Sequence, residues 1–171
     1  LKSTKMSEPS QSLSIRDLLG GSHDVGNAAT EVFDLELDDE RHFRAVADVN
    51  QLVSLRGNGS RIGAHGMARF GGRLAEFRQL TKLGVDCSRG NIGIDGLAYF
   101  SECLESAALL IDLTLDASDN AIDSAAFAHF GRHLRTRARL AKLALDFSGN
   151  EIDSEGLDEF GQHLGVLTEL S

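Results

Sequence analysis

The sequence contains little cysteine and no long apolar run. Only Cys87 and Cys103 occur among the 171 residues, too few for a disulfide framework, and neither lies in a CxxC pair of the kind that holds metals. No window approaches the ~20 consecutive apolar residues of a membrane span, and the start lacks the charged-then-apolar pattern of a signal peptide. We therefore expect free thiols, no membrane insertion and an intracellular, cytoplasmic protein.

Basic residues are outnumbered as well. The chain has 17 Lys and Arg against 26 Asp and Glu, a formal net charge of -9. Nucleic-acid binding depends on cations that neutralise phosphates, so this balance predicts that nucleic acid is not the partner. With 42% hydrophobic and 25% charged residues, the composition is that of one ordinary globular domain with a core.

Motifs for catalysis and metal binding are also missing. The sequence has no GxSxG, no phosphate-binding glycine loop and no HExxH, so we predict no enzyme activity, no cofactor and no metal. His133, His163 and Cys103 share one repeated position on successive helices. Packed helices lie ~10 Å apart, which is too far for bonds of ~2.0–2.3 Å to a single ion. Cys87 falls in an inward column, where a thiol is unreactive.

The most informative feature present is a repeat with a period of 30 residues. The segment LAKLALDFSGNEIDSEGLDEFGQHL, residues 140–164, is similar to LIDLTLDASDNAIDSAAFAHFGRHL, residues 110–134. Five apolar columns recur at this spacing: Val53, Leu83, Leu113, Leu143; Leu55, Val85, Leu115, Leu145; Ile62, Ile92, Ile122, Ile152; Phe70, Phe100, Phe130, Phe160; and Leu74, Leu104, Leu134, Leu164.

Each unit contains a strand pattern followed by a helix pattern. Leu143, Leu145 and Phe147 alternate with other residues, which predicts a short strand with one buried face. Apolar residues then recur at helical spacing after Asp153 and Ser154, a pair that can cap a helix start: Leu157, Phe160, Leu164 and Leu167. A single strand and helix cannot bury their own apolar face, so the units must stack.

Two helix positions stay small in every unit. One column is Gly66, Gly96, Ala126, Gly156, and the other is Gly71, Ser101, Gly131, Gly161. Glycine costs up to ~1 kcal/mol in a helix interior, so its recurrence predicts that neighbouring helices approach closely at these positions.

The unit resembles the leucine-rich repeat of the ribonuclease-inhibitor-like type. LDFSGNEI, residues 145–152, matches the family pattern LxLxxNxI, and the match is best from Leu80 to Leu170. The resemblance implies an α/β solenoid of about four 30-residue repeats over 50–171, with parallel strands on a concave face and helices on a convex face.

We expect a shortened capping unit at 32–49, because Phe33, Leu35 and Leu37 alternate and 43–49 carries an apolar helical face. Residues 1–31 are predicted to be a flexible tail, although a short docking helix built on Leu18 and its neighbours stays open. The chain starts at Leu1 and ends where another repeat would open. We therefore expect a larger chain or complex.

A row of charges is predicted on the concave face. Strand alternation places Arg56, Asp86, Asp116 and Asp146 on adjacent strands ~4.8 Å apart, flanked by Ser88, Ser118 and Ser148. Like charges this close repel, so we predict that a protein partner, basic at the contact, binds here. The alternative is that these aspartates are solvated consensus residues. Calcium is disfavoured because it requires six or more surrounding oxygens.

A basic patch, RHLRTRAR, contains Arg132, Arg135, Arg137 and Arg139. These cations would complement the carboxyl end of a helix, or they would bind an acidic partner at the edge of the stack.

The resemblance implies a protein-interaction or scaffold module, since proteins of this type bind partners through the concave face or the ends. Two alternatives stay open. One is a structural subunit of a large assembly, held by its helical face and edges. The other is a regulator of small GTPases, as some members of the ribonuclease-inhibitor-like type are.

Overall fold

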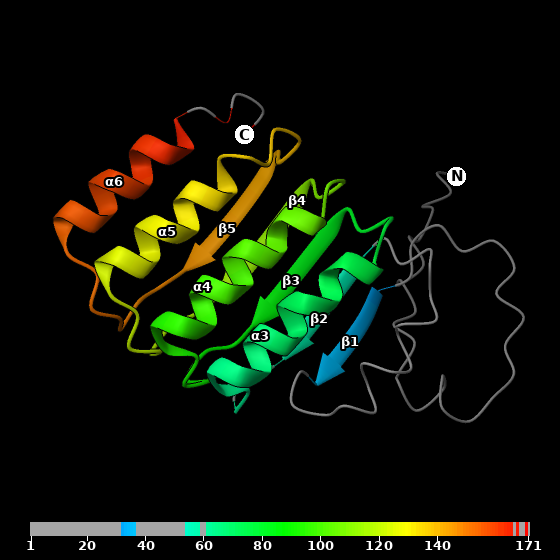
Figure 1. Ribbon diagram of the computed structural model, residues 1–171, viewed down its shortest axis with the longest axis horizontal. Helices are drawn as coiled ribbons and strands as arrows, with labels where there is room; N and C mark the ends of the chain where they lie inside the picture. The colour runs from blue at the N-terminus through cyan, green and yellow to red at the C-terminus, as the bar shows by residue number, and fades with distance from the viewer. Residues whose placement is uncertain (1–31, 37–53, 59–60, 166, 168–169, 171) are drawn as a thin grey trace, which may run out of the picture.

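The chain forms a parallel β-sheet, and helices alternate with its later strands along the sequence. The computed structural model describes residues 32–36, 54–58, 61–165, 167 and 170. The strands, in spatial order, are β1 (Val32–Glu36), β2 (Ser54–Asn58), β3 (Lys82–Asp86), β4 (Asp112–Asp116) and β5 (Lys142–Asp146), and the helices are α3 (Gly63–Arg73), α4 (Gly93–Cys103), α5 (Ser124–Leu134) and α6 (Ser154–Leu164). Every neighbouring pair of strands is parallel (Figure 1). The predicted α/β class is confirmed.

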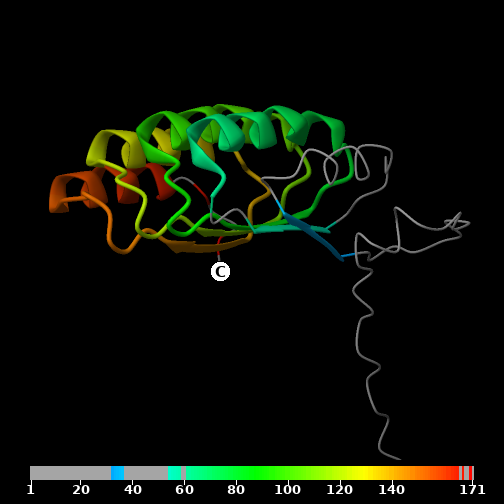
Figure 2. The same ribbon diagram turned by 90° about the horizontal axis from the view of Figure 1, so that it is seen from below.

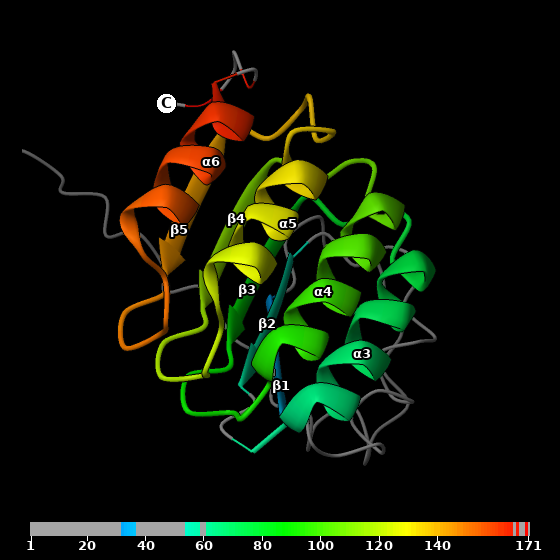
Figure 3. The same ribbon diagram turned by 60° about the vertical axis from the view of Figure 1, so that its left-hand side comes forward.

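The α-helices α3, α4, α5 and α6 lie side by side on the same face of the sheet (Figures 2 and 3). Parallel strands need a connecting segment, here a helix. Because the strands lie in sequence order, crossovers of one hand place every connecting helix on the same face. The opposite face of the sheet carries no other described element (Figure 2). We call it the open face.

The core lies between the two layers. Phe70, Phe100 and Phe130, one from each of three successive helices, are completely buried, and the rings of Phe70 and Phe100 stack with centroids 6.0 Å apart. From the sheet, Leu83 and Leu113 pack into the same cluster. The phenylalanine column read from the sequence is therefore the centre of the core.

The register of the three later strands follows the 30-residue period. Leu83 pairs with Leu113, and Leu113 pairs with Leu143. Asp86, Asp116 and Asp146 are also direct register neighbours. The columns predicted for these strands are confirmed.

The predicted register of β2 is wrong by two residues. Leu55, not Val53, pairs with Leu83, and Arg56 pairs with Gly84. The register partner of Asp86 on β2 is Asn58, so Arg56 does not extend the aspartate column.

The cause is a shorter connection after β2. Four residues, 59–62, separate β2 from α3, whereas six residues, 87–92, separate β3 from α4. A shift of two residues keeps the same alternate positions on each face of a strand, so alternation alone could not detect it.

Two of the helices begin at aspartate caps. The carboxylate of Asp123 accepts a hydrogen bond from the Ala126 amide at 2.8 Å, and that of Asp153 accepts one from the Gly156 amide at 2.9 Å. These bonds satisfy amides that have no partner within the helix. The predicted start of α6 is confirmed.

Most small helix positions lie where helices touch. A Cβ atom at Gly131 would stand 2.7 Å from a ring carbon of Phe160 on α6, and one at Gly156 would stand 2.6 Å from Cβ of Ser124 on α5. Gly71 faces Cys103 of α4 in the same way, at 3.0 Å. The predicted close approach is confirmed here, while at Gly66 the nearest atom is Ile62 of its own unit, at 2.7 Å.

Part of the predicted N-terminal organisation can be compared with the structure. Val32–Glu36 forms β1, as the alternation predicts. The tail at 1–31 and the apolar helical face at 43–49 lie outside the described residues.

Candidate functional site

The open face presents three columns of side chains across β3, β4 and β5. Because Leu83, Val85, Leu113 and Leu115 are buried against the helices, the alternate residues of each strand face the other way. The columns are Lys82, Asp112, Lys142; Gly84, Thr114, Ala144; and Asp86, Asp116, Asp146. The first alternates in charge, the second is small, and the third is acidic throughout.

Each aspartate of the acidic column is fixed by the serine two residues later. Oδ1 of Asp86, Asp116 and Asp146 accepts the serine amide at 3.1, 3.0 and 2.9 Å, respectively. The same oxygen accepts the serine hydroxyl at 2.7 Å in all three units. Ser88, Ser118 and Ser148 therefore orient the carboxylates, a role that the sequence analysis did not assign to them.

These hydrogen bonds favour the charged carboxylate. The amide and hydroxyl of Ser148 hold the pKa of Asp146 below its ordinary value, because both donors stabilise the anion. One oxygen of each carboxylate, Oδ1, accepts both hydrogen bonds that close the turn after the strand. The column is thus an ordered row of negative charge.

We expect Ser148→Ala to raise the pKa of Asp146 toward that of a free aspartate, because one of the two donors is lost. With the depressed pKa, Asp146 contributes stability at neutral pH that disappears as the pH falls through its folded-state pKa. The carboxyl carbon resonance of Asp146, followed by NMR against pH, measures this shift.

Ser106→Ala provides the control, since the Ser106 hydroxyl donates to the Cys103 carbonyl instead. An Asp146 titration unchanged by Ser148→Ala would contradict the role of the hydroxyl.

Two asparagines connect successive units beside the acidic column. Oδ1 of Asn120 accepts the Ile92 amide at 3.0 Å, and its Nδ2 donates to the Cys87 carbonyl at 2.8 Å. Oδ1 of Asn150 accepts the amides of both Asn120 and Ile122 at 3.0 Å. These side chains satisfy the backbone of the turns, and part of that backbone belongs to the preceding unit.

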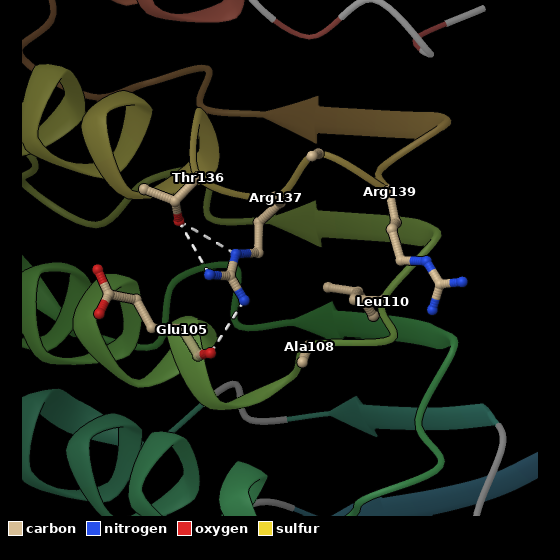
Figure 4. A pocket seen from close by; sticks show the side chains of 7 residues that line it. Glu105, Ala108, Leu110, Thr136, Arg137 and Arg139 are labelled. Carbon is tan, nitrogen blue, oxygen red and sulfur yellow. Dashed lines mark hydrogen bonds between the residues drawn. The ribbon is translucent and has the colours of Figure 1, made fainter.

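The basic patch does not act as one group. Arg137 Nη1 donates to the carbonyl of Glu105 at 2.9 Å, and its Nε and Nη2 donate to Thr136 Oγ1 (Figure 4). Nη1 also donates to the carbonyl of Leu104 at 3.4 Å. Arg137 therefore complements the carboxyl end of the preceding unit's helix, not that of α5. Arg132 and Arg135 are exposed and do not line the cavity described next.

Arg137 and Arg139 line a cavity of about 230 Å³ with Glu105, Ala108, Leu110, Thr136 and Ala138 (Figure 4). Arg137 occupies the turn position that Phe77 and Leu167 fill in other units, since the amide of each bonds to the carbonyl three residues earlier. Phe77 and Leu167 are buried, whereas Arg137 extends toward Thr136 and Glu105. The cavity thus lies beside an arginine that replaces an inward apolar side chain.

His133 and Cys87 each contact a neighbouring unit. His133 Nδ1 lies 2.9 Å from a carboxylate oxygen of Glu105 on the preceding unit. Burial raises the pKa of Cys87 to about 12, and the charges of Asp86 and Asp116 add to the shift. Its thiol is therefore protonated at neutral pH, in keeping with the predicted lack of reactivity. Among the described residues, no three His, Cys, Asp or Glu side chains are grouped to hold a metal ion.

Neither a protein-family model nor a curated protein matches the chain. Within the part of the chain that the structure describes, no helix has both the length and the apolar character to cross a bilayer.

Proposed function

We propose that the protein is a non-catalytic protein-binding module whose open face binds a partner with basic groups at the contact. The acidic column carries this proposal. Three carboxylates in direct register, each oriented by its own serine, form a row of charge on a face that no other described element covers. An ordered row of acceptors suits repeated cationic side chains, because little entropy is lost in arranging the carboxylates.

The small column beside the carboxylates supports a macromolecular ligand. Gly84, Thr114 and Ala144 project little from the sheet, so a helix or extended segment can lie across the strands. Lys82, Asp112 and Lys142 border the other side, with alternating charges that suit an oppositely patterned partner. A partner that crosses the strands would contact all three columns.

The finer fold assignment is part of the same proposal. We infer a solenoid of about four leucine-rich repeats of the ribonuclease-inhibitor-like type, with the open face as its concave side. The 30-residue register of β3, β4 and β5 and the asparagine bonds between units support it. Such a stack would present its open face as the usual binding surface of repeat proteins.

The test removes the three charges without removing the turn contacts. Asp86→Asn, Asp116→Asn and Asp146→Asn together keep an Oδ1 that accepts both serine donors. We expect this triple variant to fold like the wild type and to lose, in crosslinking and quantitative mass spectrometry from native lysate, a partner that the wild type captures. For the wild type, capture of that partner should also weaken as the salt concentration rises.

A matched variant changes net charge equally elsewhere. Glu76→Gln, Asp95→Asn and Glu102→Gln remove three exposed charges from α4 and from the turn after α3. The proposal requires that this variant retain the partner. Equal capture by the wild type and both variants would contradict binding at the acidic column, leaving the carboxylates as solvated turn residues.

A second candidate, a structural subunit held by its edges, is favoured by a different observation. The end of the stack formed by β5 and α6 is much less buried than the equivalent surface of the preceding unit. Leu157 is 56% exposed, whereas its equivalent on α5, Phe127, is 4% exposed.

A further inference from the structure

The end formed by β5 and α6 has an uncovered apolar surface. Besides Leu157, the inward residues of the last strand and its loop are only half-buried: Leu143, Leu145, Phe147 and Ile152. The equivalents one unit earlier, Leu113, Leu115, Ala117 and Ile122, are at most 1% exposed. The difference arises because α5 and β4 have a following unit beside them, and no described element covers α6 and β5 on that side (Figure 3).

The helix side of this end has the shape of a helix contact. Gly71 and Gly131 each lie where a Cβ atom would meet the next helix, at 3.0 Å and 2.7 Å. Gly161 is the next member of that column, and no atom lies within 4 Å of its Cβ position. Leu157 lies one turn before Gly161 on α6. On α5, an apolar side chain and a glycine at the same two positions pack against α6.

The residues after β5 present backbone amides whose equivalents in the preceding unit are hydrogen-bonded to the next unit. In the preceding unit, the Ala117 amide donates to the Asp146 carbonyl at 2.8 Å, and the Asp119 amide donates to the Ser148 carbonyl at 2.9 Å. The corresponding amides on the last unit belong to Phe147 and Gly149. No described residue accepts a hydrogen bond from either amide.

Two further backbone amides at this end are placed to bind the oxygen of one side chain. Asn150 Oδ1 receives the amides of Asn120 and Ile122. One unit later, the equivalent amides are those of Asn150 and Ile152, and no described residue accepts from them. A single amide or carboxylate oxygen at the matching position would satisfy both.

We propose that this end is a docking surface for a further strand–helix unit whose helix carries Lys or Arg at the contact. The partner strand adds in parallel to β5, and two of its carbonyls accept from the amides of Phe147 and Gly149. One Asn or Asp side chain after that strand accepts from Asn150 and Ile152. The partner helix packs on Leu157 and Gly161. The surface is separate from the open face, so this inference does not rest on the function proposed for the acidic column.

Charge selects the partner. On α6 the positions of Ala125, Ala128 and His129 of α5 are taken by Glu155, Asp158 and Glu159. Ala128 is 1% exposed beside the neighbouring helices, so docking would place Asp158 in a largely desolvated position, where a carboxylate requires a paired cation. The partner helix therefore carries Lys or Arg at this contact. A second copy docking through its own acidic α6 would bring like charges together, which disfavours a symmetric dimer.

The probe for the experiment is a 30-residue unit with the sequence of residues 141–170, joined to the full chain by a flexible Gly/Ser linker, which raises its effective concentration. In the probe, the equivalents of Glu155, Asp158 and Glu159 are replaced by lysine. Amide hydrogen exchange of Phe147, Gly149, Asn150 and Ile152 in the parent chain is then followed by NMR. We expect the basic probe to slow exchange at these four amides by about 100-fold or more.

Two comparisons make the result specific. A probe with alanine at its equivalent of Asn150 should leave the Asn150 and Ile152 amides of the parent chain exchanging rapidly. A probe that retains its three helix acids should give much weaker protection at all four amides. Exchange unaffected by the basic probe would overturn the proposal.

Gly161→Leu and Gly131→Leu form a matched pair in the parent chain. The first adds a side chain in open space, so the melting temperature of the chain without a probe should not fall, yet the basic probe should no longer protect the four amides. The second adds a side chain against Phe160 and should destabilise the chain itself. Retained protection in Gly161→Leu would overturn the helix contact. Concentration-dependent dimers abolished by Gly161→Leu, seen by sedimentation without any probe, would replace the basic partner with a second copy.

Discussion

Asn120→Ala is expected to lower the free energy of unfolding by about 3 kcal/mol, because a buried donor and carbonyls lose their hydrogen-bond partner. The Asn120 side chain is 2% exposed and makes three hydrogen bonds, to the Ile92 amide and to the carbonyls of Cys87 and Ser118. Alanine leaves the Ile92 amide without an acceptor in a position that water does not reach. Urea unfolding followed by circular dichroism measures the loss.

Asn150→Ala is the natural comparison, since the side chain makes the same kinds of bond one unit later. Its Oδ1 accepts two amides, and its Nδ2 donates to the carbonyls of Ala117 and Phe147. Asn150 is half-buried, so water can replace part of what is lost, and the effect should be smaller than at Asn120. Equal losses in the two variants, or a loss below 1 kcal/mol at Asn120, would contradict the view that burial makes these bonds important.

Phe100→Ala is expected to cost about 3–5 kcal/mol, the range for removing a buried aromatic ring from a well-packed core. Phe100 is completely buried, stacks on Phe70 and lies on the central one of the three helices that carry Phe70, Phe100 and Phe130. Its neighbouring units leave little freedom for the surroundings to collapse into the space. Thermal and urea unfolding should both show the decrease.

Tyr99→Ala tests whether position in the core, and not loss of an aromatic ring as such, causes the effect. Tyr99 precedes Phe100 on α4 but is 55% exposed, so its replacement should change the free energy of unfolding by no more than about 0.5 kcal/mol. A comparable loss for both variants would mean that the outer surface of α4 is covered by something outside the described residues.

The sequence was most informative where one physical requirement repeats. From Lys82 to Leu164, each unit places leucines on one face of a strand and a phenylalanine on the inner side of a helix, so period and register could be derived together. The register predicted for β2 was wrong, because a shift of two residues leaves the alternation of the strand unchanged. Only the length of the connection before α3 distinguishes the two alignments, and alternation carries no information about loop length.

The candidate site was predictable in position but not in chemistry. Alternation placed Asp86, Asp116 and Asp146 on one face, and the structure gives them that register. The serine bonds depend on the turn geometry after each strand, which residue types alone do not specify. The roles of Asn120 and Arg137 were also missed in part, because both side chains bond to backbone about thirty residues away. For Arg137, the signal in the sequence was an arginine at a position that is Phe77 and Leu167 in other units.

The shortened connection after β2 shows where this architecture accepts a change in length. Deleting two residues between a strand and its helix moves the strand along its neighbour but returns every side chain to its original face. A shift of one residue along the neighbour would turn the leucines outward and break the core. Strands should therefore move along their neighbours in steps of two residues, while a difference of one residue, as between the connections 87–92 and 117–123, is taken up at the start of the helix.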